Sequence, residues 1–201
     1  RIRLAAPMSF GVRNVAPLIA EFLEAHDAIE IELNLSDARV DIVAEGYDVA
    51  LRIADLPDSS LRARRLCSIA SHMVAAPAYL ARHGTPAHPA DLGEHRLLGY
   101  TNVTGPWRFR ARDGAEVSVK AQGPLSANSG DAAMPALLAG LGIARLPDFI
   151  LGDALETGRV VEILPDWAPA PVGLHLLTPP SALRPARVEA LIDFLSARLK
   201  D

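Results

Sequence analysis

The sequence predicts an α/β fold in which parallel strands alternate with helices. Three observations support this: Ile2 and Leu4 alternate with arginines, apolar residues from Val12 to Leu23 recur at helical spacing, and residues 30–35 (EIELNL) alternate again. A strand, a helix and a second strand in this order favour a mostly parallel sheet. The chain has 201 residues, 50% of them hydrophobic, which is enough for one folded unit or two small lobes.

The first strand ends at Pro7, and Ser9 follows as a natural helix N-cap, so a helix is expected from Phe10. Pro17 cannot donate a hydrogen bond to the carbonyl of Arg13, so that helix should kink or restart there. The second strand ends at Ser36.

Residues 40–66 combine three local patterns. Val40, Val43 and Ala44 predict a short helical face that Gly46 can end, because glycine reaches the left-handed conformation found past helix C-termini. Residues 49–53 alternate as a strand, and the Asp-, Ser- and Pro-rich residues 54–60 predict a solvent-facing loop. The arginines that follow favour a solvated strand edge; they are Arg62, Arg64 and Arg65.

The remainder of the chain continues the alternation of strands and helices. The expected strands are 66–76, 97–101, 107–111, 116–121, 143–146, 160–164 and 172–178, with a hairpin turn at 112–114. The expected helices are 77–84, 130–138 (interrupted by Pro135), 149–156 and a last helix from Pro185. That last helix has a clean apolar stripe, formed by Val188, Leu191, Ile192, Leu195 and Leu199.

Composition argues against several classes of function. A net charge of −4 disfavours a nucleic-acid surface, since phosphate neutralisation needs clustered Lys and Arg. Cys67 is the single cysteine, which excludes an internal disulfide and allows a reducing compartment. No apolar run reaches the roughly 18 residues of a membrane span, and no leader pattern precedes Arg1. The chain starts directly on a strand pattern without Met, as expected of an excised domain or a processed chain.

Catalytic, metal and cofactor motifs are not recognisable. Gly140-Leu141-Gly142 lacks the last glycine of the dinucleotide fingerprint and is expected to end a helix. Asp55 and Asp58 lie in a turn rich in Pro and Ser, where solvation is favoured over acid/base chemistry. No nucleophile elbow or P-loop occurs. His83, His88 and His95 have no metal-ligand spacing, and His72, inside an apolar strand, is expected to be a hydrogen-bonded core or cleft residue.

Several motifs together resemble the effector-binding domain of LysR-type transcriptional regulators. They cover nearly the whole chain in the family's order: DIVAEGYDVALRI at 41–53, the Asp58-Ser59-Ser60-Leu61 turn with residues 61–66, AAPAYLARHGTP with PADLGEH within 75–95, ALLAGLGIARLPDF at 136–149, and GRVVEILPDW at 158–167.

The resemblance implies two Rossmann-like lobes joined by a two-strand hinge, a fold like that of type 2 periplasmic binding proteins. Lobe I would comprise residues 1–67 plus 178–201 and lobe II residues 68–177, with the family's winged helix-turn-helix absent from this chain. It further implies a bacterial, cytoplasmic sensor that forms a homodimer or tetramer. A small metabolite, such as a carboxylate or an aromatic compound, would bind between the lobes without a cofactor and control promoter binding through rearrangement of the oligomer.

Polar residues that follow strands are the candidate effector contacts, because ligands of α/β folds bind beyond the carboxyl ends of strands. Plain helix capping is the alternative for Ser9 and Ser129, and the resemblance favours ligand contact at Ser9. Ordinary loop polarity is the alternative for the other polar residues. The full candidate set is Ser9, Phe10 as an apolar wall, Ser36, Thr101, Asn102, Asn128 and Ser129.

Two other functions fit the same fold. A solute-binding protein of an import system shares the hinged lobes, and an export signal upstream would favour it. An enzyme on this fold is disfavoured by the missing catalytic motifs, and turnover assays would distinguish it. The sequence leaves open the effector, the target genes and whether the regulator activates or represses.

Overall fold

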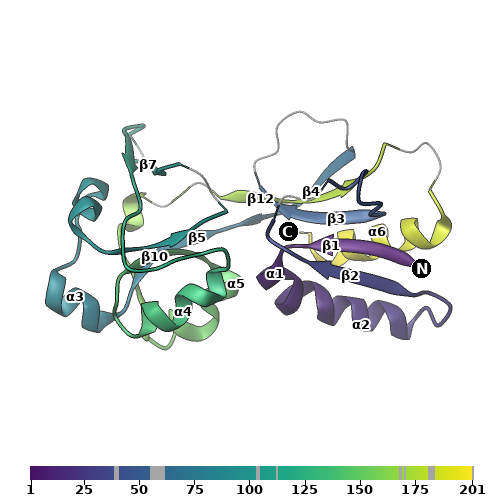
Figure 1. Ribbon diagram of the computed structural model, residues 1–201, viewed down its shortest axis with the longest axis horizontal. Helices are drawn as coiled ribbons and strands as arrows, with labels where there is room; N and C mark the ends of the chain where they lie inside the picture. The colour runs from purple at the N-terminus through teal and green to yellow at the C-terminus, as the bar shows by residue number, and fades with distance from the viewer. Residues whose placement is uncertain are drawn as a thin grey trace. The chain divides into compact units, whose positions relative to one another are not determined.

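The computed structural model describes residues 1–38, 41–54, 62–102, 105–111, 113–167, 169, 171–180 and 184–200. The chain divides into two compact units (Figure 1). Unit 1 comprises Arg1–Ile69 and Val172–Asp201, and unit 2 comprises Ala70–Pro171. Unit 1 is therefore discontinuous in sequence.

Unit 1 contains a five-stranded sheet of order β2-β1-β3-β12-β4. Two of its strand pairs are parallel and two are antiparallel. β1 (Ile2–Ala6) pairs in parallel with β2 (Ile31–Leu35) and β3 (Val49–Ile53), as the βαβ pattern predicts. β12 (Val172–Thr178) pairs antiparallel with β3 and with β4 (Arg62–Ile69). The expectation of a mostly parallel sheet fails at β12, which enters the sheet from unit 2 and not through a crossover helix.

The two faces of this sheet bury different residues, because successive side chains of a strand point in opposite directions. Ala5, Ala50 and Leu177 pack in one cluster with Ile42 and Tyr47. The alternate strand residues are equally buried and belong to the opposite face; they are Leu4, Val49, Leu51 and Leu176.

Two long helical segments pack against each other in unit 1 (Figure 1). The first comprises α1 (Met8–Phe10), the π-helical η1 (Gly11–Val15) and α2 (Ala16–Glu24); the second is α6 (Ala186–Arg198). The Phe22 and Phe194 ring centroids lie 5.3 Å apart. The predicted restart near Pro17 is confirmed, since Pro17 lies in the first turn of α2 after the π-helical segment.

Two local expectations in unit 1 are wrong by small amounts. Residues 42–46 form a turn instead of a short helix, and the Asp41 carboxylate accepts the N–H groups of Val43 and Ala44 at its start. Gly46 does adopt φ of 70°, and Val40 lies outside the described residues. Pro185 occupies the N-cap position of α6, one residue before the expected one.

The long strand expected at 66–76 is two strands. β4 ends at Ile69 and β5 (Ser71–Ala75) begins after Ala70. The break separates two sheets: β4 pairs with β12 in unit 1, and β5 pairs with β10 (Ile143–Pro147) and β11 (Val161–Glu162) in unit 2. Apolar periodicity continues across such a break, so the sequence pattern does not reveal it.

Unit 2 contains a mixed sheet of order β11-β5-β10-β6-β9, in which β6 (Leu97–Tyr100) is parallel to β9 (Ser126–Ala127) and to β10. A separate antiparallel hairpin, confirmed as predicted, joins β7 (Trp107–Arg110) to β8 (Glu116–Val119). The helices are α3 (Pro77–His83), η2 (Pro89–Glu94), α4 (Gly130–Leu138), α5 (Asp148–Leu151), η3 (Gly152–Ala154) and η4 (Pro165–Trp167). The helix expected at 149–156 and the strand expected at 160–164 are thus shorter than predicted.

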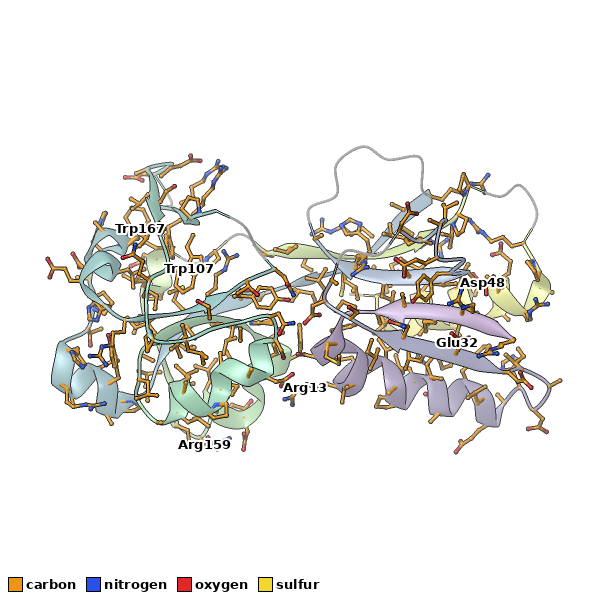
Figure 2. The ribbon with its side chains drawn as sticks, in the orientation of Figure 1. Arg13, Glu32, Asp48, Trp107, Arg159 and Trp167 are labelled. Carbon is orange, nitrogen blue, oxygen red and sulfur yellow. The ribbon has the colours of Figure 1, made fainter. Side chains whose placement is uncertain are left out.

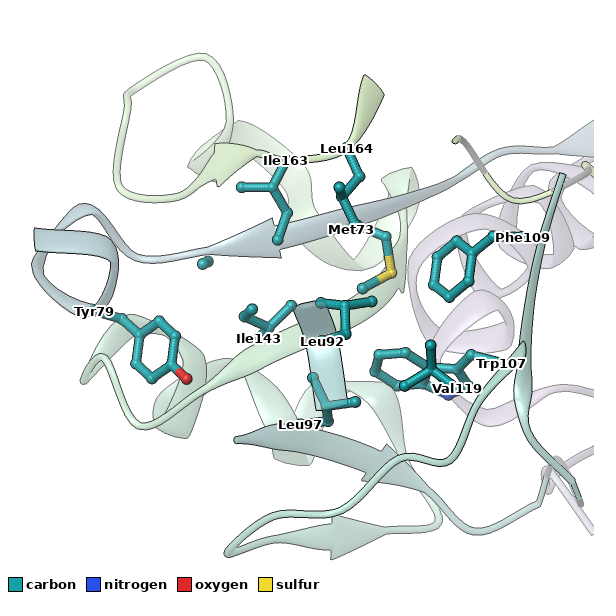
Figure 3. Packing of buried hydrophobic residues seen from close by; sticks show 11 residues of the cluster. Met73, Tyr79, Leu92, Leu97, Trp107, Phe109, Val119, Ile143, Ile163 and Leu164 are labelled. Atoms are coloured by element: carbon teal, nitrogen blue, oxygen red, sulfur yellow. The ribbon is translucent and has the colours of Figure 1, made fainter. Parts of the chain in front are cut away.

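Both faces of the unit 2 sheet are covered. Successive residues of a strand point to opposite faces of the sheet, so they belong to two different clusters. Met73, Leu97 and Ile143 lie in one cluster, and Val74 and Leu98 lie in the other. The first cluster packs against the hairpin and η2 through Trp107, Phe109, Val119 and Leu92 (Figure 3). Trp107 and Trp167 both lie in unit 2 (Figure 2). The second cluster is packed by α4 and α5 through Ala133, Leu137, Ile150 and Leu151.

Substitution at Gly123 tests how tightly the segment after β8 fits against β6. A Cβ at Gly123 would lie 2.2 Å from the Leu97 backbone oxygen, so Gly123→Ala forces a backbone shift. We expect a loss of about 1 to 3 kcal/mol in the free energy of unfolding, measured by urea denaturation. Gly93→Ala is the matched control, because nothing lies within 4 Å of its added Cβ. Equal stabilities of the two variants would contradict this packing.

Candidate functional site

In unit 1, the carboxyl ends of β1 and β2 bring two polar loops together. The parallel register pairs Ala6 with Leu35, so the residues that follow each strand are neighbours. The Ser36 N–H donates to the Ala6 carbonyl at 3.0 Å and extends this pairing by one step. The register therefore places Ser36 beside the segment that leads into α1.

The start of α1 differs from the expectation in one respect. Ser9 is not the N-cap; the helix begins at Met8, and Pro7 occupies the cap position with φ −59° and ψ 145°. Pro7 has no side-chain acceptor to offer. The Asp37 carboxylate, which follows β2, accepts the Met8 N–H at 2.8 Å in its place. Asp37 was missed because this cap comes from a residue 29 positions away.

Ser9 is thereby left with an unsatisfied hydroxyl. It is 5% exposed, and its Oγ has no hydrogen-bond partner among the residues that the structure describes. Phe10 beside it is 4% exposed. A buried hydroxyl without a partner costs about 1 to 3 kcal/mol, so an acceptor brought to it would be stabilising. The Ser36 Oγ is used differently, because it accepts the Ala38 N–H at 3.2 Å.

In unit 2, the carboxyl ends of β6 and β9 form a second polar edge. Tyr100 pairs with Ala127 in parallel register, and the Thr101 N–H donates to the Ala127 carbonyl at 2.9 Å. The Asn102 amide nitrogen lies 3.3 Å from the Tyr100 hydroxyl and 3.0 Å from the Asn128 carbonyl. The structure thus brings Thr101, Asn102 and Asn128 together. Tyr100 was not predicted, because it belongs to the strand itself.

Ser129 is the N-cap residue of α4, as expected, with extended φ −134° and ψ 133°. Its side chain makes no capping hydrogen bond. The first-turn N–H groups of α4 therefore keep donor capacity toward a ligand, in addition to the hydroxyl.

These two edges offer hydroxyls, amides and backbone N–H groups. Within the described residues, no group of three or more His, Cys, Asp and Glu side chains could hold a metal ion. His72 is hydrogen-bonded as expected, with its Nδ1 2.8 Å from a Glu162 carboxylate oxygen. Asp55 and Asp58 lie outside the described residues. Each edge by itself offers groups that can hydrogen-bond to a small polar ligand.

No helix in the described part of the chain is long and apolar enough to cross a membrane.

The family profile described as "LysR substrate binding domain" matches residues 1–200. The chain belongs to this family. Among curated proteins, an uncharacterized HTH-type transcriptional regulator of Haemophilus influenzae is 36% identical over 189 residues, covering 94% of this chain and 66% of the relative. The probable HTH-type transcriptional regulator LtrA of Klebsiella pneumoniae is 35% identical, covering 98% and 65%. The chain thus spans about two thirds of the length of these relatives.

Solved structures agree with the family assignment. The full-length Vibrio cholerae virulence activator AphB, a member of the LTTR family, has a TM-score of 0.89 and 32% identity, covering 99% of this chain and 68% of AphB. The regulatory domain of CrgA from Neisseria meningitidis has a TM-score of 0.83 and 28% identity, with 98% of each chain covered. The predicted type 2 periplasmic-binding-protein-like fold is confirmed, and the LysR-type effector-binding domain is favoured over a solute-binding protein.

The role of Asp37 is testable by stability. Asp37→Ala removes the acceptor of the Met8 N–H, so the free energy of unfolding should fall by about 0.5 to 2 kcal/mol. Asp27→Ala, at an exposed residue near the other end of the same helical segment, should change it by less than about 0.5 kcal/mol. Chemical denaturation of both variants is the measurement. An Asp37 variant as stable as the Asp27 variant would refute the cap.

Proposed function

We propose that the chain is the effector-sensing part of a bacterial, cytoplasmic transcription regulator, and that the whole protein contacts DNA through a helix-turn-helix domain outside residues 1–201. The relatives support this, because they are named HTH-type regulators and this chain spans about two thirds of their length. The net charge of −4 supports assigning DNA contact to another part of the protein.

The observation that carries the proposal is the buried hydroxyl of Ser9, which has no hydrogen-bond partner among the described residues. A ligand acceptor placed there would satisfy the hydroxyl and recover the cost of burying it. We propose that the effector is a small metabolite with hydrogen-bond acceptors, such as a carboxylate. Its contacts are Ser9, Phe10 and Ser36 in unit 1, and Thr101, Asn102, Asn128 and Ser129 in unit 2.

A ligand that contacts residues of both units would bind more tightly to the conformation in which all of these contacts are made. It would therefore increase the population of that conformation. That preference is the signal that would alter the oligomer and its promoter binding. Binding without turnover is the proposed activity, and the hydroxyl side chains at both edges, with the amides of Asn102 and Asn128 in unit 2, support it over acid/base chemistry.

Affinity measurements on substituted chains test the contacts. The cognate metabolite would first be found by thermal-shift screening of small carboxylates and aromatic metabolites, since a specific ligand stabilises the folded chain. Ser9→Ala and Thr101→Val should each weaken its binding by about 1 to 2 kcal/mol in calorimetry, because each removes one hydrogen-bonding hydroxyl. The double variant should show non-additive losses if both hydroxyls bind one ligand.

Ser196→Ala is the control for general effects of losing a hydroxyl in unit 1, because Ser196 lies on α6 and accepts a hydrogen bond from Arg64. It should leave affinity unchanged. If Ser9→Ala and Thr101→Val also bind the metabolite as tightly as the parent chain, the site assignment is wrong.

We also propose that the chain self-associates, as a dimer or tetramer, through the helical segment after Ser9 and the helix after Asp131. Exposed apolar side chains at both places support this: Val12 is 56% exposed, and Leu138 and Leu141 are 37% and 45% exposed. The first helical segment exposes less apolar surface than its sequence pattern predicts, because Val15, Ile19 and Phe22 are buried. An isologous contact would use the same two patches twice.

Val12→Asp should shift the chain toward monomer in sedimentation velocity at tens of micromolar, because it puts a charge into the proposed apolar contact. Val43→Asp is the matched control, since Val43 is also 56% exposed but lies in the 42–46 turn. A parent chain that is monomeric throughout this range, or equal effects of both substitutions, would contradict the proposed surface.

A further inference from the structure

Unit 2 contains a solvent-open cavity of about 400 Å³ beside η2 and β8, in which Ser118, Lys120 and Gln122 are exposed. Leu92 and Val119, which are buried in the core cluster, supply part of its apolar lining (Figure 3). Its polar lining groups are His95, Ser118, Lys120 and Gln122. Ser118 lies on β8, Lys120 and Gln122 follow that strand, and His95 precedes the amino end of β6. The candidate effector residues Thr101 and Asn102 instead follow the carboxyl end of β6.

A buried tyrosine fixes the hydrogen-bonding state of His95. Tyr79 is 1% exposed, and its hydroxyl oxygen accepts the Arg96 N–H at 3.0 Å. The same oxygen lies 3.2 Å from His95 Nδ1. The hydroxyl proton needs an acceptor, so a neutral His95 accepts it on Nδ1 and carries its own proton on Nε2. This cavity-lining side chain therefore offers an N–H donor.

Both walls of the cavity are anchored. On one side, the Leu97 N–H donates to the Gln122 carbonyl at 2.8 Å, and Gly123 packs too closely on Leu97 to admit a Cβ. On the other side, the Asp91 carboxylate caps η2 by accepting the N–H groups of His88 and Ala87 at 2.9 and 3.0 Å. These bonds lower the pKa of Asp91, so the cap is complete at neutral pH and is lost as the pH falls through that lowered value.

The charge of the lining favours an anion. Lys120 is one of two lysines in the chain, Lys200 being the other. The lining residues, all of which the structure describes, include no carboxylate. An ammonium group, an imidazole N–H, a hydroxyl and an amide form a donor set suited to the several acceptor oxygens of an oxyanion.

We propose that this cavity is a second ligand site, which binds a small oxyanion of the phosphate class through Lys120 and His95. Lys120 supplies the charge, Ser118 and Gln122 supply neutral donors, and Tyr79 is a positioning residue that holds His95 in the donor tautomer. The site lies within unit 2, and it does not depend on the effector contacts proposed above.

Titration of the ¹⁵N-labelled chain with inorganic phosphate, at ionic strength held constant with chloride, tests this site by NMR. The amides of residues 118–120 should shift saturably, and long-range spectra of the imidazole nitrogens should report His95 as the Nε2–H tautomer. Lys120→Met and His95→Phe should each weaken binding about 10-fold, the usual loss for a charge-assisted hydrogen bond. Glycerol 3-phosphate in a parallel titration distinguishes a phosphate monoester from the free ion.

Lys200→Met and Ser196→Ala are the matched controls, and both should bind phosphate like the parent chain. Lys120 is exposed, so its substitution should leave the amide spectrum dispersed and the result interpretable. Shifts that never saturate, that are the same with chloride, or that saturate at the same phosphate concentration in Lys120→Met as in the parent chain would overturn the proposal. An Nδ1–H tautomer at His95 would overturn the role given to Tyr79.

Discussion

The parallel pairing of two short pairs of strands determines where the candidate site residues lie. β1 with β2 in unit 1, and β6 with β9 in unit 2, are each in a register that ends both strands at the same edge of the sheet. Backbone bonds extend each pairing one residue further, through Ser36 and Thr101. Polar residues distant in sequence therefore become neighbours because of backbone hydrogen bonding, before any side chain contributes.

At the start of α1 in unit 1, the pairing of β1 with β2 leaves the Ser9 hydroxyl available for a ligand. Pro7 sets the extended backbone before the helix, and Asp37 from the neighbouring loop caps the Met8 N–H. With that N–H satisfied from outside the helix, Ser9 does not have to serve as a cap. Its hydroxyl is buried next to Phe10 without a partner among the described residues. A buried polar group of this kind lowers stability, and ligand binding is a physical reason for a fold to retain it.

Sequence patterns predicted the parts of the fold that depend on local chemistry. Alternation located β1, β2 and β3, and glycines ended α3 at Gly84 and the turn after α4 at Gly140. The predictions failed where a tertiary contact decides. Asp37 caps a helix from another loop. The extended segment is divided into β4 and β5 because the two strands join different sheets. The cavity lining of unit 2 likewise depends on Tyr79 reaching His95 across 16 residues.

A crystal structure of the chain with its bound metabolite would show whether Ser9 contacts the effector. A ligand acceptor should lie about 2.7 to 3.0 Å from Ser9 Oγ, and other polar atoms of the same ligand should contact Thr101 or Ser129. A ligand that leaves the Ser9 hydroxyl without a partner, or that binds away from the ends of β1 and β6, would contradict the proposed site.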